Sequence, residues 1–306
     1  MSKSMLSLLS ALVLGTLFAL PAAAQSAKIS LGYPPAPDFL PAFVAKEKGF
    51  FDKRRLDVTM NRIALGSNIP AAMVSGDLQI GMGSATVLFD TAEAGLGLVA
   101  IAGAARFPDK TPNFSVVARA GLKISGARDL EGKKVGVPGV RNIADVLFRK
   151  WMLQKGASPA KVTYVEASFP QMRDMLKGGT VDAVVAIDPF RSRMLGDGTG
   201  FKVADYIAEL GKNILATFWM AKGDWASANP QVIRAFREAL AEAVAYIEKN
   251  PEECRKIEQK YIGLTSPIWP VFSVALDPRD LEFYASISKE LGMTRKPVDV
   301  SRLVLK

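Results

Sequence analysis

Histidine is absent from this chain of 306 residues, and cysteine occurs only once, as Cys254. Without histidine the chain has neither a Ser-His-Asp triad nor a Cys-His pair, and no imidazole is available to bind a metal. A single cysteine forms no intramolecular disulfide bond and no cysteine-rich metal cluster. We therefore expect no metal site, no cofactor and no enzymatic activity, although carboxylates and lysines remain as conceivable catalytic groups. Cys254 lies in an expected helix and is interpreted as a structural thiol.

Long blocks of like charge are also missing. Charged residues make up 23% of the chain and hydrophobic residues 49%, a balance that excludes intrinsic disorder. Lysine and arginine (39) outnumber aspartate and glutamate (30), which gives a net charge of +9. The basic residues are scattered, with Lys53-Arg54-Arg55 as the densest run and no aromatic residues between them. This pattern is typical of a solvated surface, so we expect no nucleic-acid partner.

The longest apolar run lies at the amino terminus. Lys3 precedes the run Met5–Leu20, and Ala22 and Ala24 form an A-x-A pattern before Gln25. The run is shorter than the roughly 20 residues that a membrane-spanning helix needs. Together these features predict a signal peptide over residues 1–24 that is cleaved during secretion. No cysteine lies near the cleavage point, so we expect an unlipidated, periplasmic or extracellular chain; the alternative is an uncleaved amino-terminal anchor.

Short strands and helices alternate through the first two thirds of the chain. Asp38 is expected to cap the first of the helices. The alternation is typical of an α/β protein in which helices cover a parallel sheet. The expected strands are residues 29–32, 56–61, 79–82, 98–102, 134–137, 162–165 and 183–187, and the expected helices are residues 38–49, 69–74, 87–94, 143–155 and 171–176.

The last third is mainly helical. Asn229 is expected to cap a helix that begins at Pro230, and Ile233, Phe236 and Leu240 start its apolar stripe. Two further helices are expected over residues 252–261 and 280–291.

Four segments resemble one protein family. Residues 41–52, PAFVAKEKGFFD, look like the first lobe of the nitrate/sulfonate/taurine-type (NMT1/THI5-like) periplasmic substrate-binding proteins of ABC importers. Residues 71–77, 129–137 and 181–190 fit the same family in the same order. The resemblance implies a two-lobed periplasmic-binding-protein fold (type II) with a ligand cleft between the lobes. It also implies hinge closure around a small molecule, and delivery of that molecule to ABC permease subunits in the inner membrane by a monomeric protein.

On this resemblance, lobe one comprises residues 26–117 and 215–306, and lobe two comprises residues 118–214. The crossings between them are expected near residues 116–119 and 213–217. Ligands of open α/β sheets bind where strands end and helices begin, and this rule selects the candidate site residues. They are Tyr33, Phe39, Ser67, Asn68, Gly83, Ser84, Thr86, Arg141, Asn142 and Asp188.

Each candidate also has a purely structural interpretation. The glycine shapes a turn, Ser67, Asn68 and Asn142 cap helices, the two aromatic rings pack, and Asp188 anchors a loop. Arg141 and the helix amino termini favour an anionic solute such as a sulfonate or carboxylate. Asp38 and Asp188 favour a donor or cationic group instead, and a neutral heterocycle also fits.

Two other functions stay open at this point. One is a periplasmic sensor that presents its ligand to a receptor. The other is a pyrimidine-precursor synthase on the same fold, although that enzyme class relies on an active-site histidine and a cysteine-rich segment that this chain lacks.

Overall fold

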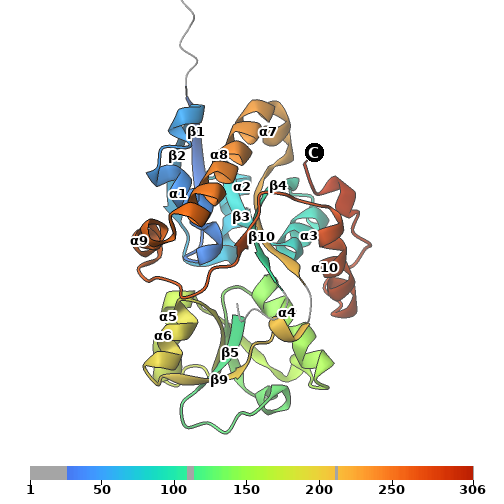
Figure 1. Cartoon of the computed structure of the whole chain (residues 1–306). Coiled ribbons are helices and arrows are strands. Elements are labelled where there is room, and N and C mark those ends of the chain that lie inside the picture. Colours follow the sequence, from blue (N-terminus) through green and yellow to red (C-terminus); the bar gives the residue numbers. More distant parts are fainter. Residues whose placement is uncertain (1–25, 109–113, 211–212, 306) are drawn as a thin grey trace, which may run out of the picture.

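Two separate sheets, each covered by helices, make up the protein (Figure 1). The structure is a computed structural model and describes residues 26–108, 114–210 and 213–305. The expected signal peptide, residues 1–24, lies outside the described residues.

The first sheet has six strands in the order β11-β4-β10-β3-β1-β2. β1 is parallel to β2 and β3, as expected, but β10 lies antiparallel between β3 and β4. The four strands expected from the first part of the chain do run in one direction, and a strand from late in the chain is inserted between the last two of them. The strands are β1 (Ala27–Tyr33), β2 (Leu56–Arg62), β3 (Ile80–Gly83), β4 (Leu98–Phe107), β10 (Ile214–Lys222) and β11 (Val271–Phe272).

The second sheet has five strands in the order β7-β6-β8-β5-β9. β6 is parallel to β7 and β8, whereas β5 is antiparallel to β8 and β9. In each sheet a strand that follows a crossing between the sheets is inserted antiparallel to its neighbours: β10 in the first and β5 in the second. The strands are β5 (Phe114–Arg119), β6 (Lys134–Val137), β7 (Thr163–Glu166), β8 (Ala183–Ile187) and β9 (Gly200–Ala204).

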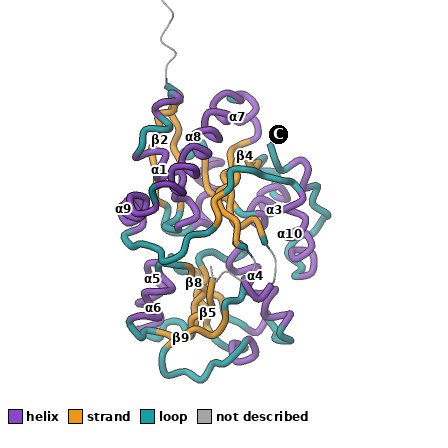
Figure 2. The backbone as a smooth tube through the Cα atoms, in the orientation of Figure 1, coloured by secondary structure: helices purple, strands orange, loops and turns teal. Residues whose placement is uncertain are grey.

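Helices, drawn in purple in Figure 2, cover the sheets. The apolar stripe of the longest helix is buried, as its spacing predicted. Asn229 does not cap that helix, because its amide donates to the carbonyl of Trp225. The helices are α1 (Leu40–Glu47), α2 (Ile69–Ser75), α3 (Ala85–Glu93), α4 (Ile143–Gln154), α5 (Phe169–Lys177), α6 (Phe190–Gly196), α7 (Gly223–Ala228), α8 (Pro230–Lys249), α9 (Pro251–Ile262) and α10 (Arg279–Glu290).

The chain passes between the sheets twice, after β4 and before β10. The first crossing was expected near residues 116–119. These residues already belong to β5 and pair with β8, so the crossing comes before them in the chain. The second crossing ends where β10 begins at Ile214, close to its expected place. Residues 109–113 and 211–212, within these crossings, lie outside the described residues. Helix α4 of the second lobe contacts α3 and α10 of the first.

Candidate ligand-binding cleft

A cavity lies between the lobes and is lined by both. Most of its walls come from the carboxyl ends of parallel strands: residues after β1 and β2 and within β3 on one side, and residues after β6 and β7 and the last residue of β8 on the other. Thr217 of β10 and Phe114 of β5 complete the lining. This is where α/β sheets place their ligands. The cavity has a volume of about 30 Å³, so any solute larger than a few atoms requires the lobes to move apart. Its lining residues are Pro34, Ala36, Asp38, Phe39, Ala64, Gly66, Met82 and Thr217 of lobe one, and Phe114, Pro138, Asn142, Ile143, Ala144, Phe169 and Ile187 of lobe two.

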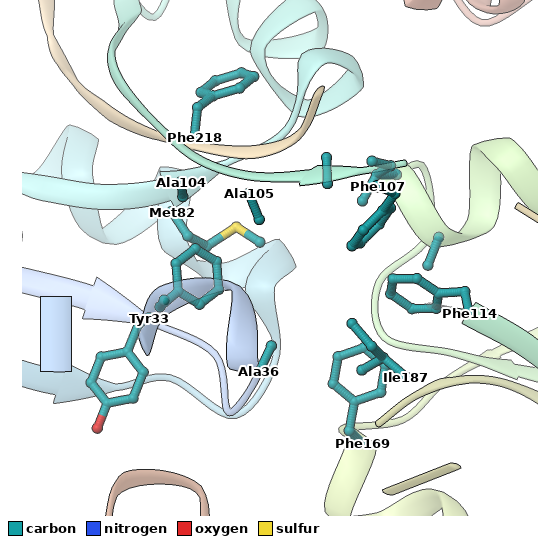
Figure 3. Packing of buried hydrophobic residues seen from close by; sticks show 14 of the residues in the cluster. Tyr33, Ala36, Met82, Ala104, Ala105, Phe107, Phe114, Phe169, Ile187 and Phe218 are labelled. Carbon is teal, nitrogen blue, oxygen red and sulfur yellow. The ribbon is translucent and has the colours of Figure 1, made fainter. Parts of the chain in front are cut away.

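Apolar and aromatic side chains form most of this lining. Phe114 and Phe169 lie 6.0 Å apart between ring centroids and are joined by Ile187 on the lobe-two wall. Figure 3 shows these three residues facing Ala36 and Met82 of lobe one across the cavity. The surface is suited to the flat apolar part of a small organic molecule.

Among the described residues that line the cavity, Asp38 alone is charged. Its side chain is 3% exposed, and Oδ2 accepts a hydrogen bond of 3.1 Å from the hydroxyl of Thr217 on β10. Oδ1 is buried without a hydrogen-bond partner. Burial raises the pKa of Asp38 to about 7, and the Thr217 hydrogen bond offsets part of that rise. The expected cap is absent, because α1 and the short turn before it receive no side-chain hydrogen bond at their starts.

Asn142 lies on the opposite wall at the start of α4. Its Oδ1 accepts hydrogen bonds from the backbone N–H groups of Ala144 (3.0 Å) and Asp145 (3.3 Å). This cap fixes the orientation of the amide, so that Nδ2 is left as a donor at the cavity wall. Asn142 therefore combines the two interpretations that its sequence position allowed.

Arg141, the residue before this cap, points elsewhere. Its guanidinium binds Asp90 of α3 through Nε (2.8 Å) and Nη2 (2.5 Å), and it donates to the carbonyl of Met293. Its own carbonyl accepts a 2.6 Å hydrogen bond from Thr86. Arg141 and Thr86 thus join the two lobes, and neither lines the cavity. The backbone of Arg141 is left-handed, with φ of 66°, which turns the side chain toward lobe one.

Among the ten expected site residues, the structure brings only Phe39 and Asn142 to the cavity. Tyr33 packs on Phe43 and Tyr261, with centroid distances of 4.8 and 6.1 Å, and points away from Phe114 and Phe169 in Figure 3. Gly83 is a packing position, because a side chain there would meet the thioether of Met220. Asp188 forms an ion pair with Arg191 (2.9 Å) and serves as a buried anchor.

The remaining three expected residues do not line the cavity. Ser67 approaches lobe two, since its Cβ lies 3.5 Å from the place that a Cβ on Gly139 would take, and its hydroxyl oxygen is buried without a partner. Asn68 precedes α2 without a capping hydrogen bond, and the fully buried Ser84 precedes α3 in the same way.

Comparison with known sequences identifies the family. The family model described as NMT1/THI5 like matches residues 36–254, which is most of the chain. The protein belongs to the NMT1/THI5-like family. The resemblance seen in the sequence is confirmed by this match.

Two relatives of this NMT1/THI5-like protein bind small solutes. It is 26% identical over 263 residues to the nitrate/nitrite binding protein NrtA of Nostoc sp., a match that covers 79% of this chain and 60% of NrtA. It is 24% identical over 241 residues to the taurine-binding periplasmic protein of Escherichia coli, over 75% of this chain and 69% of the relative. The chain therefore spans less than two thirds of NrtA.

Comparison of structures confirms the fold. The alkanesulfonate-binding protein SsuA of Xanthomonas axonopodis pv. citri, bound to MOPS, superimposes with a TM-score of 0.79 at 21% identity. The match covers 92% of this chain and 99% of SsuA. The expected two-lobed periplasmic-binding-protein fold is thus correct.

Other site classes find little support in the described part of this NMT1/THI5-like chain. Over residues 26–108, 114–210 and 213–305, no three acidic or cysteine side chains gather as a metal site would require. No helix in the same ranges has the length and apolar character to cross a membrane. The thiol of Cys254 is buried, and burial raises its pKa to about 11, which keeps it protonated and unreactive near neutral pH.

Proposed function

We propose that this protein is the solute-binding component of an ABC importer, which captures a small organic molecule between its lobes. The observation that carries the proposal is the cavity with walls from both lobes. A solute held there contacts both lobes at once, so binding stabilises the closed arrangement. The family match and the solute-binding relatives support the same function.

The partners of the protein follow from this role. The closed, loaded form would dock on permease subunits in the inner membrane, and the protein would act as a periplasmic monomer. Transport of a solute from the periplasm also accounts for the A-x-A pattern before Gln25.

Export predicts a defined mature chain. Protein recovered from the periplasm is expected to begin at Gln25 and to carry no lipid, as measured by intact mass. A retained Met1 or an added acyl chain would contradict this prediction.

An enzymatic role is the main alternative, since the chain is also 22% identical over 242 residues to the 4-amino-5-hydroxymethyl-2-methylpyrimidine phosphate synthase THI13 of Saccharomyces cerevisiae. Binding without turnover fits this chain better, because it has no histidine and its single cysteine is buried. A sensor role would share the same cleft and is distinguished by neighbouring genes, which would encode a receptor rather than a permease and an ATPase.

A thermal-shift screen tests the proposed function. The mature protein is expected to melt at a higher temperature with at least one member of a panel of sulfonates, carboxylates, nitrate, amines, amides and pyrimidines, because a ligand bound only to the folded state stabilises it. The hit should be recovered unchanged after incubation, as shown by mass spectrometry. Chemical conversion of the hit would favour the enzyme, and the absence of any hit would reject the proposal.

A further inference from the structure

One carboxyl oxygen of Asp38, in the cleft, lacks a hydrogen-bond partner. Oδ1 of Asp38 is buried without a hydrogen bond, while Oδ2 is bound to Thr217. A buried acceptor left unpaired costs roughly 1–3 kcal/mol, so such atoms are rare in native proteins. Asp38 lies directly at the cavity, so a donor group on the solute is the natural partner for this oxygen.

Among the described residues that line the cavity, none is a cation that could face Asp38. The neighbouring elements present Thr217 from β10, Met82 from β3 and Phe114 from β5, and the other lining residues are equally uncharged. Arg141 is committed to Asp90 and to the carbonyl of Met293 outside the cavity. A solute with only acceptor atoms would therefore meet an acidic group and no positive charge, which is an unfavourable pairing when both are buried.

The opposite wall offers a complementary group. Asn142 uses Oδ1 for its cap, so Nδ2 can donate to an acceptor on the solute. Between these two polar ends lie the rings of Phe39, Phe114 and Phe169. Small-molecule sites in general are mostly apolar and, like this one, use only a few polar groups to fix the orientation of the ligand.

We infer that the solute carries an N–H donor, as in an amide, amidine or amine, which hydrogen-bonds to Asp38, and that simple anions without a donor are poor ligands. The inference rests on the proposed function and narrows the solute class that the sequence left open.

The charge of Asp38 makes the inference testable by pH. Burial places the pKa of Asp38 at about 7, so the carboxyl group is mostly neutral at pH 5.5 and mostly ionised at pH 8. A cationic amidine pairs with the ionised form, and its affinity should rise roughly tenfold across this range. An anion held by the neutral O–H would show the opposite trend.

Two series of probes of similar shape test the donor directly: acetamidine, acetamide and acetate, and benzamidine, benzamide and benzoate. Calorimetry at pH 8 should show binding of the amidine or amide of at least one series, and weaker or no binding of the matching carboxylate. Asp38→Asn should weaken the binding probe about tenfold or more, since hydrogen bonds to charged groups are the stronger ones. Asp57→Asn, at an exposed carboxylate on β2, is the matched control and should leave affinity within about twofold.

The outcomes separate the inference from the proposed function. If a carboxylate or nitrate binds more tightly than the amidine and amide, or if its affinity rises toward pH 5.5, the inference is wrong and solute binding stands. The affinity of the tightest hit of the larger screen is measured for wild type, Asp38→Asn and Asp57→Asn. The inference is also wrong if that hit has no donor group and binds Asp38→Asn as tightly as wild type. If Asp38→Asn fails to fold, the pH dependence of probe affinity in the wild-type protein is the test instead. If neither set of compounds binds, the proposed function itself fails.

Discussion

Asp38 destabilises the solute-free protein as the pH rises. Burial raises its pKa from 3.8 to about 7, so between these values the folded state holds a proton that the unfolded state has released. Stability therefore falls as the pH increases from about 4 to about 7 and is level above that. Asp38→Asn cannot ionise and escapes this loss. The melting temperature of the variant relative to wild type should be several degrees more favourable at pH 8 than at pH 5.

Asp57→Asn supplies the reference for this comparison, because it removes a carboxylate that is exposed on β2 and makes no contact with the cavity. A difference between Asp38→Asn and wild type that is the same at pH 5 and pH 8 would show that Asp38 is ionised throughout, and would remove the pH argument for the solute class.

The sequence predicted where the site lies better than which side chains form it. The rule that ligands bind at strand ends placed Phe39 and Asn142 at the cavity. The same rule selected Arg141, whose side chain leaves the cavity because its backbone is left-handed and Asp90 lies within reach. The environment of Asp38 depends on Thr217, 179 positions away. No local pattern reveals that pairing, so Asp38 was interpreted as a helix cap and was left out of the expected site residues, although its charge was already taken to favour a donor or cationic group.

At the scale of secondary structure, local signals worked where they were strong. The helix starting at Asn142 follows from its capping residue, and the return helix from Pro230 follows from its apolar spacing. β10 was not predicted as a strand of the first sheet, although Ile214–Ala221 is apolar at every position except Thr217. Its burial on both faces removes the alternation that identifies a strand. Its antiparallel insertion between β3 and β4 is a long-range pairing that only the folded chain shows.

At the scale of the whole molecule, α4 and Arg141, which precedes it, hold the lobes together along one edge of the cleft. Arg141 binds Asp90 and the carbonyl of Met293, and Lys150 binds Glu290 of α10 at 2.6 Å. These contacts form only while the lobes are close together. They therefore favour the closed arrangement; they must break for the solute to enter and form again when the lobes close on it.

Removal of the Arg141 contacts should shift the lobes toward the open form. Arg141→Ala is expected to increase the radius of gyration of the solute-free protein in small-angle scattering and to weaken solute binding by up to about fivefold. The effect is modest because the ion pair is partly exposed, with side-chain exposures of 39% and 34%, and such pairs contribute roughly 0.2–1 kcal/mol. Asp90→Ala should act in the same direction, and the double variant should add little to either change. Arg279→Ala, which removes an exposed pair with Asp277 within lobe one, should change neither quantity.

A direct contact between Arg141 and an anionic solute predicts a different pattern: a large loss of affinity for Arg141→Ala, with Asp90→Ala neutral or improved because the guanidinium is released. The comparison of Arg141→Ala with Asp90→Ala therefore decides whether this arginine holds the solute or the lobes.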